Sequence, residues 1–182
     1  MHVMSSKTFI IPLLFFCEHI VTIVYQKRVG PRSLTDYDMM ELAIAEALKA
    51  SHEGEVPVGA VLASAGEVIA KNHNRALSQH DPTAHAEMLV LREGAARIGN
   101  YRLNGCDLYV TIEPCLMCAG AIVQSRISRL IFGARDEKGG AVESLYHLLD
   151  DPRLNHHVQV TEGIHTERCQ QILRSFFRAR RG

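Results

Sequence analysis

The sequence predicts an α/β fold, a three-layer α/β/α sandwich in which helices cover both faces of one five-stranded mixed sheet. Stretches with apolar residues at helical spacing alternate with short apolar runs suited to strands, in the order α-β-β-α-β-α-β-α-β-α. The chain has 182 residues, 47% of them hydrophobic, which is enough for one sizeable core. No internal repeat or low-complexity tract interrupts this order, so we expect a single folded domain.

Each expected element follows from a local pattern. In the first helix, charged residues occupy one face and apolar residues the other, namely Met40, Ala43, Ile44, Ala47 and Leu48. Asp81-Pro82-Thr83 offers capping side chains and a proline before the second helix, and Pro114 opens the third. Gly59, in the first strand, indicates close approach of another group to the backbone. Helices are expected at 36–54, 84–98, from 114, at 144–149 and 166–181, and strands at 56–63, 68–70, 107–112, 130–133 and 158–161.

Charge and cysteine content narrow the class of protein. The formal net charge is zero, yet residues 35–150 carry ten Lys/Arg against sixteen Asp/Glu, and residues 151–182 carry six against three. An acidic body with a basic tail points to an anionic partner bound at one place. The cysteines number five, and three of them show no disulfide-framework spacing: Cys17, Cys106 and Cys169. We therefore expect a reducing compartment, the cytoplasm.

The first 34 residues do not fit this pattern. Thr8–Tyr25 is apolar over nearly the length of a membrane span, but Pro12, Glu18 and His19 interrupt it and no small-x-small cleavage site follows. A membrane-insertion signal is one interpretation. We favour the other, that residues 1–34 form a leader outside the fold, that residues 35–182 form the domain, and that no stable membrane association occurs.

Candidate metal ligands lie in two short stretches. Cys115 and Cys118 are three residues apart near the start of an expected helix, and His85 is at the start of another. Two thiols and one imidazole suit Zn²⁺, and helix N-termini favour thiolate over thiol. A structural zinc site has four protein ligands, whereas a catalytic site has three and an open position. Glu87 lies close enough to carry protons there. The alternative is a structural zinc knuckle, with His73, His80 or Cys106 as fourth ligand.

Several stretches together carry a resemblance to a known family. They are Glu55–Val61, Asp81–Glu87, Asn100–Leu103, Glu113–Ala121, Ser125–Ile127, Phe132–Asp136 and Phe176–Arg178. From about Asp36 to Arg181 the chain resembles the cytidine deaminase-like superfamily. Within it, the chain resembles the bacterial tRNA-specific adenosine deaminases (TadA-type). H-x-E followed by P-C-x-x-C is the signature of the zinc-dependent base deaminases, and the later stretches select the tRNA-editing branch.

The resemblance implies a chemistry for the metal residues. His85, Cys115 and Cys118 would hold one Zn²⁺ per subunit, and Glu87 would be the catalytic proton carrier. The reaction would be hydrolytic deamination of adenosine to inosine at the wobble position of a tRNA anticodon, an arginine tRNA in this family. The partner would be the anticodon stem-loop, and the protein would be a homodimer.

The resemblance also implies substrate contacts. Asn74 matches an asparagine that hydrogen-bonds the target base, Val58 a wall of the base pocket, and Asp136 a residue that meets the neighbouring ribose. On sequence alone, these positions would be a loop asparagine that caps a turn, a buried strand valine and a solvated acid.

The C-terminal segment predicts how RNA is held. Residues 168–182 contain five arginines and no acid. Arginine donates paired hydrogen bonds to phosphate, and aromatic rings stack on unpaired bases. We therefore expect RNA contacts from Phe176, Phe177, Arg178, Arg180 and Arg181. The alternative is that both phenylalanines fill the core and the arginines form a solvated face.

Three hypotheses for function follow. The first is an RNA-editing adenosine deaminase. The second is a deaminase of a free base or nucleoside such as guanine or cytosine, which would not need an arginine-rich helix. The third is a zinc-binding module without catalysis. The first accounts for the metal residues and the basic helix together.

Overall fold

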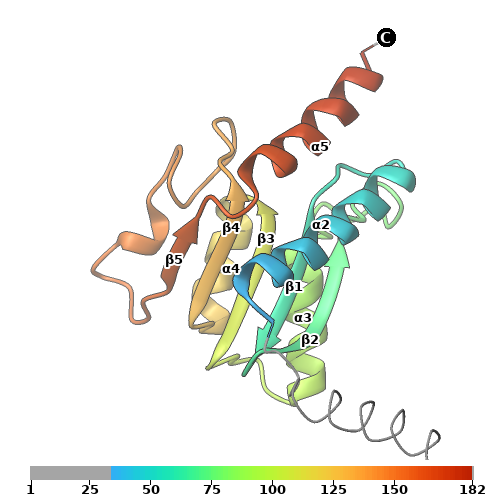
Figure 1. The fold of residues 1–182 in the computed structure, drawn as a ribbon. Coiled ribbons are helices and arrows are strands. Elements are labelled where there is room, and N and C mark those ends of the chain that lie inside the picture. The colour runs from blue at the N-terminus through green and yellow to red at the C-terminus, as the bar shows by residue number, and fades with distance from the viewer. Residues whose placement is uncertain (1–33, 182) are drawn as a thin grey trace, which may run out of the picture. The chain divides into compact units, whose positions relative to one another are not determined.

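The computed structural model describes residues 34–181, which form one five-stranded sheet between two layers of helices (Figure 1). The strands lie in the order β2-β1-β3-β4-β5. The apolar segment Thr8–Tyr25 and all of the proposed leader except Leu34 fall outside the described residues. The three-layer α/β/α architecture with a mixed sheet, expected from the sequence, is confirmed.

The elements follow the expected order. The strands are β1 (Gly59–Ser64), β2 (Glu67–His73), β3 (Cys106–Ile112), β4 (Arg129–Ala134) and β5 (Gln159–Glu162). The helices are α2 (Asp36–His52), α3 (Ala86–Ile98), α4 (Leu116–Ser125) and α5 (Thr166–Ala179), with a short 3₁₀ helix, η1 (Leu148–Asp150). Between residues 34 and 181, no helix is both long enough and apolar enough to cross a membrane.

The sheet's pairing gathers several chain segments at one edge. Strand β1 is antiparallel to both β2 and β3, whereas β3, β4 and β5 are mutually parallel. The residue before β1 therefore lies at the same edge as the residues that follow β2, β3 and β4. These are Val58, Asn74, Glu113 and Arg135. In open α/β sheets the edge at the carboxyl ends of parallel strands is where sites form.

Two apolar clusters join the helices to the two faces of the sheet. On one face, Met40 and Ile44 of α2 and Cys169 of α5 pack with Val61 and Ile131. On the other face, residues of α3 and α4 pack with alternate residues of the same strands, among them Val90, Ile122, Leu62, Leu108 and Phe132. This alternation along each strand is what a sheet covered on both sides requires.

Gly59 confirms the expected close approach. A Cβ atom there would lie 2.0 Å from the carbonyl oxygen of Ala43 and 2.5 Å from the amide nitrogen of Ala47, so no side chain fits between β1 and α2. The absence of a side chain lets α2 lie against the strand at the point where β1 begins, beside the site edge.

Two expected elements differ from the structure. The strand expected from residue 56 begins at Gly59, because Pro57 has no N–H and Val58 donates its own to Val56 two residues back. The helix expected at 144–149 is replaced by turns and η1. There, the amide of Ser144 donates to the carboxylate of Glu113 at 2.9 Å and not to a helical carbonyl.

Candidate metal centre and active site

Two helix N-termini bring the three candidate ligands together. His85 is the N-cap residue of α3, Cys115 is the N-cap residue of α4, and Cys118 lies in the first turn of α4. Neither residue caps its helix with a side-chain hydrogen bond, so both side chains can point at a shared ligand. The partial positive charge of two helix starts favours anionic sulfur at this point.

The donor atoms fit a tetrahedral zinc ion. The Nδ1 atom of His85 lies 3.7 Å from the Sγ of Cys115 and 3.6 Å from the Sγ of Cys118. All three donor atoms lie within 4.8 Å of one another. Zinc with Zn–S of about 2.3 Å and Zn–N of about 2.0 Å places sulfur and nitrogen about 3.5 Å apart. The described residues therefore contain a set of donors that could hold a metal ion.

The protein groups alone already favour one thiolate. The pKa of Cys115 is lowered to about 3 by a hydrogen bond from Cys118 and another from His85, which outweigh burial. The same bond to Cys115, together with burial, raises the pKa of Cys118. The pKa of His85 is raised, chiefly by its hydrogen bond to Cys115. His85, Cys115 and Cys118 therefore share protons through hydrogen bonds with one another, and a cation that binds them must displace protons from these groups.

Glu87 is a buried carboxyl close to the candidate ligands. It lies in the first turn of α3, two residues after His85, and its side chain is only 3% exposed. Burial raises its pKa, so its protonated form is favoured more than for a carboxyl group in water. Glu87 does not belong to the group of possible metal ligands. A buried carboxyl beside a metal site is the arrangement that general acid–base catalysis needs.

The three alternative fourth ligands are not part of this group. The ring of His73 is buried between two carboxylates, with Nδ1 3.2 Å from Glu46 and Nε2 3.1 Å from Glu53. Cys106 begins β3, whereas the ligand-bearing segment follows the end of that strand. Within residues 34–181, the group therefore offers three candidate protein ligands, and three is the number typical of catalytic zinc.

Two hydrogen bonds link the two expected base-pocket residues, Val58 and Asn74, to the start of α3. The backbone amide of Asn74 donates to the carbonyl of Val58 at 3.1 Å. The side-chain oxygen of Asn74 accepts from the amide of Ala86 at 2.9 Å. Both side chains are more than nine-tenths buried. Val58 and Asn74 therefore lie beside the first turn of α3, next to His85 and Glu87.

Asp136 reaches the same edge through a loop after β4. Its amide donates to the carboxylate of Glu113 at 3.0 Å, and Glu113 is two residues before Cys115. The Asp136 side chain accepts from the amide of Lys138 at 3.0 Å, which closes a turn. The structure thus gathers His85, Glu87, Cys115, Cys118, Val58, Asn74 and Asp136 at one edge of the sheet.

The residues expected on the terminal helix divide into two groups. Phe176 is buried and Phe177 is 41% exposed, so Phe177 has more ring surface available to a base. The guanidinium of Arg180 donates to the carbonyl of Gly54 and lies 4.5 Å from the ring centre of Phe176. Burial favours the packing alternative for Phe176, and Arg180 is engaged within the protein.

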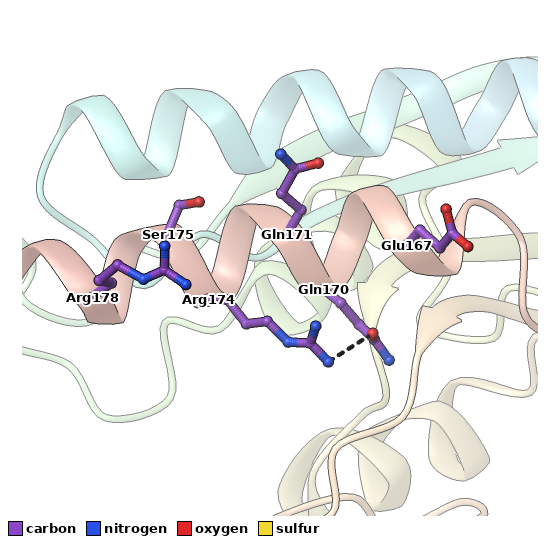
Figure 2. A pocket seen from close by; sticks show the side chains of 6 residues that line it. All are labelled: Glu167, Gln170, Gln171, Arg174, Ser175 and Arg178. Carbon is purple, nitrogen blue, oxygen red and sulfur yellow. Dashed lines mark hydrogen bonds between the residues drawn. The ribbon is translucent and has the colours of Figure 1, made fainter.

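A polar pocket lies along another side of α5 (Figure 2). Its lining residues are Glu167, Gln170, Gln171, Arg174, Ser175 and Arg178. Arg174 donates to the side-chain oxygen of Gln170 at 3.0 Å. Arg178 is therefore presented with Arg174, which lies one helical turn earlier, on a surface formed by charged and polar residues.

Two buried acids with clear structural roles were missed by sequence reasoning. Glu55 accepts the amides of Leu77 and Ser78, at 3.1 and 2.7 Å, and so holds the loop between Asn74 and His85. Glu113 accepts four backbone amides and one hydroxyl. A signal was available in the sequence, because each acid lies inside a stretch that resembles the family. Glu113 immediately precedes Pro114, and one residue separates Glu55 from Pro57.

Comparison with known proteins identifies the family to which the chain belongs. A family model described as MafB19-like deaminase matches residues 34–181. A tRNA-specific adenosine deaminase from Haemophilus influenzae is 52% identical over 151 residues, which cover 82% of this chain and 87% of that protein. One from Bacillus subtilis is 50% identical over 139 residues, which cover 76% and 86%.

Solved structures agree on the fold. One, from work on A-to-I editing by tRNA:A34 deaminases at the wobble position of transfer RNA, has a TM-score of 0.72 and 48% identity. The alignment covers 74% of this chain and 98% of the other. A guanine deaminase from Nitrosomonas europaea has a TM-score of 0.70 at 21% identity and covers 96% and 98%, so it supports the fold alone. Half of the aligned residues are shared with curated relatives over most of both chains, and the chain belongs to the family of tRNA-specific adenosine deaminases.

Proposed function

We propose that this protein is a zinc-dependent hydrolase that converts adenosine to inosine in the anticodon of a tRNA. The observation that carries the proposal is the geometry of the site. Three donors lie at zinc spacing, and the buried carboxyl Glu87 lies in the same helical turn as the histidine. Membership of the family supplies the substrate class.

We assign each residue of the site a separate role in the reaction. His85, Cys115 and Cys118 would hold zinc, which supplies the Lewis acidity that makes water a nucleophile at neutral pH. Glu87 takes the proton of the attacking water and delivers it to the adenine ring nitrogen beside the amino-bearing carbon, C6. It then takes the remaining proton from the hydroxyl now on C6 and delivers it to the amine, which leaves as ammonia while the C6 carbonyl forms. Adenosine and water thus become inosine and ammonia, with Glu87 restored.

The surroundings of the site suit a purine base. Val58 would contact the flat face of the base, and the amide nitrogen of Asn74 would donate to an acceptor on its rim. Glu87 and Asn74 are both more than nine-tenths buried, which keeps bulk water away from the reacting atoms. Asp136, at the outer side of the same edge, would meet the neighbouring ribose hydroxyl.

The finer specificity is part of the proposal. We expect the target to be the wobble adenosine of an arginine tRNA, held as a stem-loop, with arginines of α5 on the phosphates. We also expect a homodimer with one zinc per subunit. The wobble position is supported by a relative of 48% identity from work on tRNA:A34 deaminases.

The test compares an anticodon stem-loop with free nucleosides and bases. Purified protein loaded with zinc should release ammonia from a stem-loop with adenosine at the wobble position, and the product should read as guanosine on sequencing. The kcat/KM for free adenosine, cytosine and guanine should be at least about a thousandfold lower, because these substrates lack the binding energy that the arginine contacts contribute. Deamination of guanine at a comparable rate would establish the alternative function, and release from no substrate would leave a zinc-binding module.

A further inference from the structure

Glu113 is a buried carboxylate whose two oxygens hold different parts of one loop. Oε1 accepts the amides of Val142, Glu143 and Ser144, at 3.0, 2.7 and 2.9 Å. Oε2 accepts the amide of Asp136 at 3.0 Å and the hydroxyl of Ser144. Glu113 is only 2% exposed, so these bonds replace its hydration almost completely.

The loop closes directly on this carboxylate. A Cβ atom on Gly140 would lie 2.3 Å from the carboxyl carbon of Glu113, so a side chain at 140 would displace the acid. The amide of Ala141 donates to the carbonyl of Pro114 at 2.9 Å, and Cys115 forms an isolated β-bridge with Gly140. The loop is therefore attached to the segment that carries a candidate metal ligand.

We propose that Glu113 is a positioning residue that places Asp136 against the substrate, through the hydrogen bond that the Asp136 backbone amide donates to Oε2. The proposal rests on the proposed function, in which Asp136 meets the ribose beside the target base. Oε1 has a separate, structural role, since its three partners lie six or more residues beyond Asp136. The two roles belong to different oxygens, and one substitution separates them.

Glu113→Gln makes this separation. The amide carbonyl of glutamine takes the place of Oε1 and keeps the three amides of 142–144, because the reverse orientation would point an N–H₂ group at three N–H donors. The N–H₂ group then faces the amide of Asp136, donor against donor, and that bond is lost. The Ser144 hydroxyl turns to accept from the N–H₂ group.

The expected result is a change in KM and not in zinc content. Glu113→Gln should raise the KM for the stem-loop roughly tenfold, while kcat changes by less than about twofold and zinc stoichiometry stays the same. Asp136→Ala should raise KM by a similar factor. The double variant should be no worse than Asp136→Ala alone, because a residue that acts only through Asp136 has nothing left to position.

Glu55→Gln is the matched control. Glu55 is also a buried acid that accepts backbone amides at this edge, but its partners are Leu77 and Ser78. Its effect on KM should multiply with that of Asp136→Ala. If the effects of Glu113→Gln and Asp136→Ala multiplied in the same way, or if Glu113→Gln lost zinc, Glu113 would be merely structural and the proposal would be overturned.

Hydrogen exchange tests the positioning without relying on activity. In Glu113→Gln, the amide of Asp136 should exchange faster while those of 142–144 keep their protection; equal acceleration at all four amides would overturn the proposal. This readout stands even if the wild-type protein edits no RNA, an outcome that removes only the proposed function. If Glu113→Gln does not fold, Gly140→Ala displaces the carboxylate from the loop side. Because this disturbs both oxygens, its KM effect should become smaller in the Asp136→Ala background without vanishing, and an equal KM effect in both backgrounds would overturn the proposal.

Discussion

The side-chain oxygen of Asn74 accepts a hydrogen bond from the backbone amide of Ala86 at 2.9 Å. Ala86 opens α3, and the N-cap residue His85 makes no capping bond with its own side chain. Asn74 therefore satisfies an amide that the helix start leaves without an intrahelical partner. Because the side-chain oxygen of Asn74 accepts this bond, the group that Asn74 offers to a substrate is its N–H₂ group.

Two substitutions at Asn74 separate these roles. Asn74→Asp keeps an oxygen for Ala86 but loses the N–H₂ donors, so stability and zinc content should hold while kcat/KM falls about tenfold to a hundredfold. Asn74→Ala loses both, and the free energy of unfolding should fall by about 1 kcal/mol in addition. Urea unfolding and single-turnover deamination measure the two effects. Equal activity of the Asp variant and the wild type would mean that Asn74 only caps α3.

Glu87→Ala should abolish deamination and leave one zinc per chain. The carboxyl carries protons and is not among the three donor residues, so its removal takes away a catalytic step but no ligand. The rate should fall by at least about a thousandfold, and metal analysis of the purified variant should be unchanged. Loss of zinc from this variant would make Glu87 a fourth ligand and support a structural metal site.

The grouping of the three candidate ligands could be predicted from the sequence, because each of them is marked by a local pattern. His85, Cys115 and Cys118 each stand at or near a helix start, and a proline or a capping residue marks those starts in the sequence. The fold followed for the same reason, since each element's apolar period shows which faces are buried.

The role of Glu113 could not be predicted in this way. Its partners are backbone amides 23 to 31 residues further along the chain, and backbone amides leave no residue pattern. The same holds for Arg180, which reaches a carbonyl 126 residues away. Contacts of this kind also replaced the expected helix at 144–149, since Ser144 gives its amide to Glu113.

We propose that the domain folds without its first 33 residues. Thr35 and Asp38 form a reciprocal capping box, in which each side chain accepts the other's backbone amide, and this starts α2 from within the domain. A chain of residues 34–182 should therefore fold, bind one zinc and edit RNA as well as the full chain. The long form, with its apolar run Phe9–Phe16, should be more prone to aggregate or to associate with vesicles. Failure of the short chain to fold, where the long chain folds, would contradict this.

Asp36 gives the stability of the domain a defined pH dependence. Burial opposes its ionisation, but bonds from Arg129 at 2.5 Å and Tyr109 at 2.7 Å outweigh burial and lower its pKa from the ordinary 3.8. The ionised carboxylate therefore stabilises the fold above pH 3.8 and loses this contribution as the pH falls through the lowered pKa. Asp36→Asn should cost about 1–2 kcal/mol at pH 7, and the two curves should converge in acid.

The control for Asp36 is Glu67→Gln, at an exposed acid that begins β2. Its free energy of unfolding should differ from wild type by less than about 0.5 kcal/mol across the same pH range. Chemical unfolding at several pH values measures both variants. A penalty for Asp36→Asn that stayed constant down to the acid limit would show that side-chain size, and not charge, is what matters at this position.

The arginines of α5 should separate into RNA-binding and docking residues. Arg178 shares a polar pocket with Arg174 (Figure 2), whereas Arg180 donates to Gly54 next to α2. Replacing Arg174 and Arg178 with Ala should raise the Kd for the stem-loop and reduce the slope of log K against log salt by about 1.4, at about 0.7 per phosphate contact. The rate at saturating RNA should barely change, because uniform binding is what is lost.

Arg180→Ala should instead act on the fold. Losing its bond to Gly54 and its contact with the Phe176 ring should lower the free energy of unfolding by about 1 kcal/mol, with the salt slope unchanged. Arg97→Ala is the matched control for RNA binding. Arg97 is an exposed arginine in the last turn of α3, at the opposite end of this helix from His85 and Glu87. Salt titrations of RNA binding compare all three variants with wild type. If the Arg174/Arg178 pair behaved like Arg97, the basic side of α5 would be an ordinary solvated face, and the RNA phosphates would be bound by other residues.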